Sequence, residues 1–151
     1  MEENTKFLKA ILEQDWQAYD ALVEEFTRQG KGTPVAIIGF AFDLAVRRRF
    51  TNRRDIQEII RFVADARTFL NEGRDLPAKE AEALICATLD IDAPGVGATV
   101  DSLDMGIIAE IEGQLLFKLI DDEHMTQQQL HEFLMEAERR VQQWQSQNQP
   151  D

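Results

Sequence analysis

The chain has 151 residues, of which 44% are hydrophobic, and a formal net charge of -12. This length and composition are typical of a single globular domain and exclude disorder along the whole chain. The single cysteine, Cys86, excludes an internal disulfide framework, and the acidic balance disfavours general binding to nucleic acids or membrane surfaces. We therefore expect a soluble domain in a reducing, cytoplasmic setting.

No segment predicts a secretory leader or a membrane span. Residues 1–4 are acidic and lead directly into a helical pattern, unlike a secretory signal. The longest apolar run, residues 35–44, contains Asp43 and is about half as long as a bilayer requires. We expect no membrane partner.

All long segments have the helical period, and the first expected helix covers residues 4–28. Its apolar side chains recur at spacings of three and four residues: Leu12, Trp16, Tyr19, Val23 and Phe26. Gly30 and Gly32 follow it and are expected to end it.

The second expected helix begins at Pro34, is capped by Thr33, and is apolar on all sides over residues 35–46 except at Asp43. This pattern predicts a central, buried helix. A third helix is expected over residues 53–71, capped by Asn52. Its predicted inward side chains are Ile56, Ile59, Ile60, Val63, Phe69 and Leu70.

A fourth helix is expected at residues 77–89, opened by Pro77, and residues 90–101 are expected to form a loop. The fifth helix, residues 102–122, is apolar on two opposite faces, so it is also expected at the centre. Thr126 and Gln129 form a capping-box pattern at the start of the last helix. The sequence thus predicts an all-α fold: one bundle of about six helices over residues 1–144, with the second and fifth helices central and a polar tail at residues 145–151.

The charge is divided unevenly along the chain. Residues 28–79 hold 11 of the 16 Lys and Arg but only 6 of the 28 Asp and Glu, a net charge of +5, so the rest carries -17. Five arginines fall within residues 47–54, which we call the arginine island. Its counter-charge is expected from the same chain, a second copy, an acidic partner or nucleic-acid phosphate.

The arginine island supplies the candidate binding residues. Guanidinium groups bind carboxylate and phosphate through paired hydrogen bonds, and an aromatic ring beside them can stack on a base. The residues proposed for an anion or acidic partner are Arg48, Arg49, Phe50, Arg53 and Arg54. Arg47 follows Asp43 by four residues, which predicts a structural ion pair within one helix.

Weak similarity links residues 35–70 with residues 105–141, since each is an apolar helix, a turn and an amphipathic helix. If the repeat is real, the basic turn at 47–54 and the acidic turn at 121–124 are equivalent places with opposite charge. Amphipathic helices resemble one another by construction, so chance also explains the similarity.

Several site patterns are incomplete. Residues 35–71 could be interpreted as a DNA-binding helix-turn-helix motif, but the turn has no glycine. Acidic residues in the second helix would also repel phosphate. Residues 90–101 have a partial calcium-loop spacing, but Pro94 stands where a ligand belongs and Asp101 where a longer Glu is usual. A flexible acidic connector explains that loop better.

The remaining chemistry-bearing residues do not form a catalytic pattern. His124 and His131 lack the paired carboxylates of a dinuclear metal site, and Cys86 lies in an apolar stretch typical of a core position. No glycine loop of phosphate-binding type is present. We expect no catalytic residue, no metal and no cofactor.

The stretches 45–50, 61–67 and 81–85 resemble segments of small, uncharacterised helical proteins of actinobacteria. This resemblance implies a bacterial cytosolic protein and brings no activity with it. The sequence therefore favours a non-enzymatic interaction or adaptor protein that docks a protein partner or a second copy through complementary charge. Binding of nucleic acid or a phosphate ligand through residues 47–54, which the overall acidity disfavours, and a small helical enzyme of unknown reaction are the alternatives.

Overall fold

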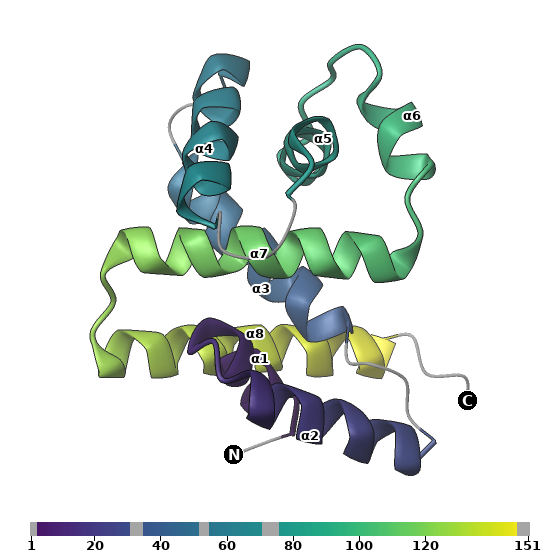
Figure 1. Cartoon of the computed structure of the whole chain (residues 1–151), viewed down its shortest axis with the longest axis vertical. Coiled ribbons are helices and arrows are strands. Elements are labelled where there is room, and N and C mark those ends of the chain that lie inside the picture. The colour runs from purple at the N-terminus through teal and green to yellow at the C-terminus, as the bar shows by residue number, and fades with distance from the viewer. Residues whose placement is uncertain (1–2, 31–34, 52–54, 71–75, 148–151) are drawn as a thin grey trace.

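The computed structural model describes residues 3–30, 35–51, 55–70 and 76–147, and in these residues the protein is an all-α domain (Figure 1). The all-α prediction is confirmed, but the described residues form eight helices rather than six. The helices are α1 (Glu3–Leu12), α2 (Trp16–Arg28), α3 (Val35–Arg49), α4 (Ile56–Phe69), α5 (Ala78–Thr88), α6 (Val96–Asp101), α7 (Met105–Glu123) and α8 (Gln127–Gln147).

The first expected helix is divided into α1 and α2. Gln14 has a φ of 54°, a left-handed conformation that interrupts helical hydrogen bonding, and the Asp15 side chain then caps α2 by accepting from the Ala18 N–H at 3.1 Å. The two helices pack on one another through aromatic rings, because Phe7 lies 5.1 Å from Tyr19 and 6.2 Å from Phe26 between ring centroids. The continuous helix predicted for residues 4–28 is therefore wrong.

Two other helix boundaries also differ from the prediction. The expected loop at residues 90–101 contains α6, which follows Gly95 in a left-handed conformation with a φ of 83°. In the third expected helix, α4 begins at Ile56 and is capped by Asp55, whose carboxylate accepts from the Gln57 N–H. The caps predicted at Asn52 and at Thr33 with Pro34 lie outside the described residues.

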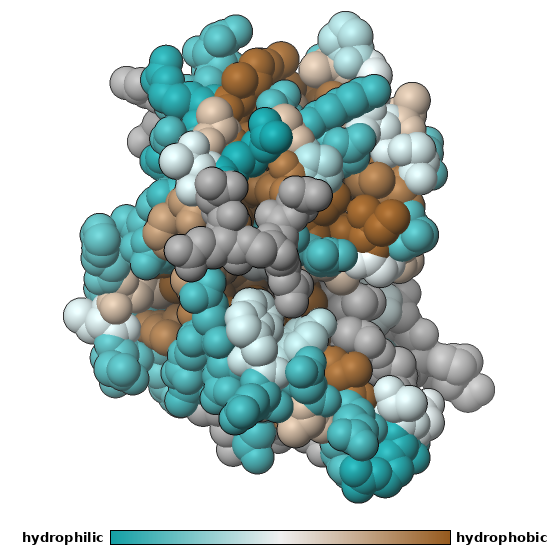
Figure 2. All heavy atoms as spheres, in the orientation of Figure 1, coloured by the Kyte–Doolittle hydropathy of each residue, from teal (hydrophilic) through white to brown (hydrophobic). Residues whose placement is uncertain are grey.

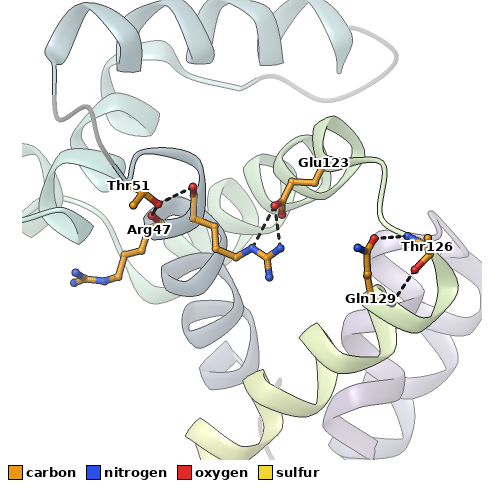
Figure 3. A network of polar contacts seen from close by, with 6 residues as sticks. Arg47, Thr51, Glu123, Thr126 and Gln129 are labelled. Carbon is orange, nitrogen blue, oxygen red and sulfur yellow. Dashed lines mark hydrogen bonds and ion pairs between the residues drawn. The ribbon is translucent and has the colours of Figure 1, made fainter.

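Other sequence signals at helix ends begin or end a helix as predicted. The backbone N–H of Thr126 donates to Gln129 Oε1 at 2.9 Å, and the Gln129 N–H donates to Thr126 Oγ1 at 3.1 Å (Figure 3). This reciprocal pair confirms the predicted capping box. Pro77 precedes α5, as expected. The last helix continues to Gln147, so the first three residues of the expected polar tail are helical.

The centre of the domain is α3, which packs most extensively against α7 and next against α8. Figure 1 shows α3 crossing behind α7, with α4 and α5 on one side of α7 and α1, α2 and α8 on the other. The buried side chains of α3 are Ile37, Ile38, Ala41, Phe42, Ala45 and Val46. The two segments predicted to be central are α3 and α7, so this prediction is confirmed. The packing of α8 against α3 makes α8 central as well.

A buried polar contact fastens α8 to α1. Thr5 and Glu138 are both buried, and the Thr5 hydroxyl donates to Glu138 Oε2 at 3.4 Å. Gln142, one turn further along α8, donates to the other carboxylate oxygen at 3.3 Å. The hydrogen bonds offset the cost of removing these groups from water.

The face shown in Figure 2 is largely hydrophilic, with separate apolar areas. Ile56 and Ile60 are 39% and 38% exposed on α4, whereas Ile59 and Val63 are buried. Phe69 is also exposed, so the prediction that Ile56, Ile60 and Phe69 face inward is wrong. Among the described residues, no helix combines the length and apolar character needed to cross a membrane.

Candidate functional site

The arginine island lies at the C-terminal end of α3 and in the turn that follows it. Arg47, Arg48 and Arg49 form the last turn of the helix, where positive charge is favoured by the helix dipole. The Thr51 hydroxyl donates to the carbonyl oxygens of Arg47 and Arg48 at 2.7 and 2.9 Å and so caps this end (Figure 3). Arg53 and Arg54 lie outside the described residues.

Arg47 is engaged within the chain. Its Nε lies 3.0 Å from Asp43 Oδ1, in the geometry expected for residues four apart on a helix. Its Nη2 also donates to the carbonyl oxygen of Thr88 at 2.9 Å, which ties α3 to the end of α5. The hydrogen bond to Asp43 and the charge of that carboxylate raise the pKa of Arg47. Arg47 is a structural residue in this arrangement.

Arg48 is paired with an acidic residue far along the chain. Its Nε and Nη2 lie 3.2 and 3.1 Å from Glu123 Oε1, across a sequence separation of 75 residues. Figure 3 shows Glu123, at the end of α7, directed toward the end of α3. The acidic turn after α7 therefore supplies counter-charge to the arginine island, which periodicity along one helix could not predict.

Arg49 differs from Arg47 and Arg48 in the groups that its guanidinium contacts. It is exposed, and its guanidinium carbon lies 5.8 Å from the centroid of the Phe50 ring and 5.7 Å from that of Phe62. This is cation–π distance. No carboxylate in the described part of the chain forms an ion pair with Arg49.

Phe50 is not available to a ligand. It is only 4% exposed, and its ring meets that of Phe62 edge to face at 5.8 Å. Phe50 thus belongs to the contact between α3 and α4, and the prediction that it could stack on a base is wrong. The reason is that the chain turns at this point, so an aromatic residue within a polar run is directed into the core.

A half-buried carboxyl group, Glu112 on α7, lies where α7 packs against α3. Its Oε1 is 3.9 Å from the position that a Cβ atom would occupy on Gly39. Burial, and then the charge of Asp43, raises the pKa of Glu112 from 4.5 to about 7. Sequence reasoning did not single out this group, because Glu110 and Gln114 flank Glu112 on the same helix and give it no distinct signal.

The other chemistry-bearing residues are dispersed. Among the described residues, no three His, Cys, Asp or Glu side chains are grouped as metal ligands. Residues 96–101, the second half of the partial calcium pattern, form α6 rather than a loop. His124 ends α7, His131 is exposed, and Cys86 is buried, which raises the pKa of its thiol and disfavours the reactive thiolate.

Comparisons of the chain with models of protein families, with curated proteins and with solved structures find no match. The resemblance to small helical proteins of actinobacteria stays a prediction.

Proposed function

We propose that this protein is a non-enzymatic interaction protein whose arginine island docks an acidic surface, on a partner protein or on a second copy of the chain. The observation that carries the proposal is the state of Arg49, which is exposed and has no ion pair among the described residues in a protein of net charge -12.

The packing of Arg49 favours binding over simple solvation. Contact with Phe50 and Phe62 restricts the guanidinium group before a ligand arrives, so less side-chain entropy is lost on binding. The planar group can present its N–H donors to a carboxylate. Arg48 lies next to it in an exposed pair with Glu123, and such pairs are weak enough to exchange partners.

An acidic protein surface fits this site better than a nucleic acid. The ring that would stack on a base, Phe50, is buried, and Arg47 is held by Asp43 and by the carbonyl oxygen of Thr88. Phosphate binding in nucleic acids depends on several cations acting together. Among the described residues of the island, 47–51, Arg49 is the arginine without a carboxylate partner, and its restricted geometry suits a carboxylate on a folded partner.

Binding of labelled probes to Arg49→Gln and to wild type tests the proposal. We expect a polyglutamate peptide to bind wild type at low salt and to bind Arg49→Gln about fivefold more weakly, the effect of losing one charge-assisted hydrogen bond. Arg28→Gln is the matched control, because Arg28 also ends a helix but is paired with Glu25 at 2.8 Å. Fluorescence anisotropy is the readout.

Two further measurements separate the possible partners. Light scattering at low and high salt detects self-association, which identifies a second copy as the partner if Arg49→Gln reduces it. Mixed-sequence single-stranded DNA is the competing probe, and preferential binding of DNA would favour the nucleic-acid alternative. A salt-insensitive monomer that binds neither probe would contradict the proposal.

A further inference from the structure

One face of α2 is left uncovered in this fold. Of the described helices, α1 is the one on which α2 packs closely, and Figure 1 shows α2 at the lower end of the molecule. The side chains of α2 that belong to the core or pack against it are Tyr19, Leu22, Val23 and Phe26. The opposite face is exposed and carries Asp20 and Glu24, which stand one helical turn apart.

These two carboxylates have no counter-charge within the described part of the chain. Neither Asp20 nor Glu24 forms an ion pair or a side-chain hydrogen bond there, whereas Glu25 on the same helix is paired with Arg28 at 2.8 Å. In the described helices, no other pair of exposed carboxylates one turn apart lies entirely without a cation. Like charges at this spacing destabilise a helix, so a cation bound between them would remove a cost.

Arg49 presents the complementary charge at the other end of the molecule. It is exposed, has no carboxylate partner among the described residues, and lies against Phe62 of α4. Figure 1 shows α4 at the upper end of the long axis and α2 at the lower end, on opposite sides of α7. The chain therefore cannot bring its own Arg49 to its own Asp20 and Glu24, but a second copy can.

The sequence segments that form these two ends also differ in net charge. Residues 1–27 hold two Lys and seven Asp or Glu, a net charge of -5, whereas residues 28–79 carry +5. Molecules with this polarity attract when the basic surface of one meets the acidic surface of the next. At about 0.1 M salt the repulsion between the net charges of whole molecules is screened beyond about 10 Å, whereas partly buried contacts are screened much less.

An aromatic ring borders the two carboxylates of α2. Trp16 stands one turn before Asp20, is 40% exposed, and meets the ring of Tyr19 edge to face at 5.7 Å. Tryptophan is enriched among the residues that contribute most to protein interfaces, and its face attracts an arginine side chain. The exposed face of α2 thus combines two carboxylates with an apolar ring, as a protein-docking surface does.

We infer that the exposed face of α2 docks the arginine island of a second copy of this chain, in a head-to-tail arrangement. Asp20 and Glu24 of one copy receive Arg49 of the next copy through charge-assisted hydrogen bonds. Arg48 joins them by exchanging its surface pair with Glu123. This inference rests on the proposed function, because it uses the same arginine island and commits its partner to a second copy.

The placement of the two surfaces determines what kind of assembly forms. They differ from one another and lie at opposite ends of the molecule, so a pair of molecules joined by one such contact still has one surface of each kind unoccupied. A contact of this type repeats from copy to copy and does not close as a symmetric pair. The assembly should therefore grow with concentration.

Sedimentation velocity of the full-length protein at about 0.1 M salt tests the inference. We expect wild type to form species that grow with concentration, and Arg49→Glu and the double variant Asp20→Lys, Glu24→Lys to remain monomeric at about ten times the concentration at which wild type associates. The double variant is less acidic overall, which by itself favours association. Asp92→Lys with Glu110→Lys is the matched control, because both positions are exposed and the charge change is equal, and it should associate at least as well as wild type.

An equimolar mixture of the two monomeric variants tests the head-to-tail arrangement. Arg49→Glu keeps its α2 face, and Asp20→Lys, Glu24→Lys keeps its arginine island, so the mixture should form a dimer that does not grow. This dimer also shows that each variant is folded with its remaining surface intact. A mixture that stays monomeric although circular dichroism shows both variants folded, or a wild-type dimer that does not grow, would overturn the arrangement.

Binding of the polyglutamate peptide separates this inference from the proposed function. If the peptide binds wild type and binds Arg49→Gln more weakly, while wild type stays monomeric at every concentration, the docking role of Arg49 stands and the second copy is excluded as its partner. If wild type neither binds the peptide nor associates, both proposals fail. Growth that persists in the variant Asp20→Lys, Glu24→Lys would overturn the role of α2 alone.

Discussion

The inner part of α3 and its last turn differ in what surrounds them. The inner part, residues 37–46, is packed on α7 and α8 by fully buried apolar side chains. The last turn holds three exposed arginines that contact two carboxylates, a carbonyl oxygen and two aromatic rings. The difference teaches that the stabilising contacts of this helix lie in its inner part. Under the proposed function the last turn would dock a partner, and changes at Arg48 and Arg49 should then cost little stability.

The largest effect is expected from Phe42→Ala in the inner part. The phenylalanine side chain is fully buried, so its loss removes apolar contacts and leaves a cavity that costs about 3–5 kcal/mol of unfolding free energy. Phe69→Ala is the control, because Phe69 is exposed although it stacks on Phe117, and it should cost about 1 kcal/mol. Urea unfolding measures both. Equal losses would show that α3 is not the centre of the core.

The second effect is the pH dependence that Glu112 adds to the same region. The folded pKa is raised, so the folded state binds more protons than the unfolded state between pH 4.5 and about 7. The stability from the neutral carboxyl is fully present below pH 4.5, falls as the pH rises toward 7, and is lost above it, by about 3 kcal/mol in total. Urea unfolding at several pH values should show this slope in wild type. A wild-type slope equal to that of Glu112→Gln would contradict it.

A smaller effect is expected at a helix end whose contacts are local. Thr126→Ala removes the hydroxyl that accepts from the Gln129 N–H and should lower the unfolding free energy by about 1 kcal/mol. Thr126→Ser keeps the hydroxyl and should lose much less. Thermal unfolding of the three proteins gives the comparison, and equal losses in both variants would mean that the capping hydrogen bond contributes nothing.

The smallest effect is expected at the last turn of α3. Arg48→Gln should cost at most about 0.5–1 kcal/mol, and less at high salt, because its pair with Glu123 lies at the surface, with the Arg48 side chain 52% exposed. A double-mutant cycle with Glu123→Gln isolates the coupling between the two side chains. A coupling of several kcal/mol would mean that the last turn is part of the stabilising core after all.

The sequence predicted contacts between residues that are close along the chain. It missed contacts between helices that are distant in the sequence. The Asp43–Arg47 contact and the box at Thr126 follow from spacings of four and three residues. The Arg48–Glu123 pair joins residues 75 apart, and no periodicity reveals it. The positive φ of Gln14, which separates α1 from α2, carries no glycine signal, so a single helix was the natural expectation.

The candidate site was partly predictable for the same reason. Helix-end placement correctly located Arg47, Arg48 and Arg49, whereas nothing in the sequence singled out Glu112. Burial of Phe50 depends on where α4 packs after the turn, which is tertiary information. Exposure of Ile56 and Ile60 beside buried Ile59 depends on a rotation of α4 that adjacent isoleucines cannot specify.

The most direct test of the account compares binding and stability in one variant, Arg49→Gln. We predict about fivefold weaker binding of the polyglutamate peptide at low salt, with an unfolding free energy within about 0.5 kcal/mol of wild type. Unchanged binding would contradict the docking role of Arg49. A loss of stability as large as the loss of binding would contradict the separation of stability from binding along α3.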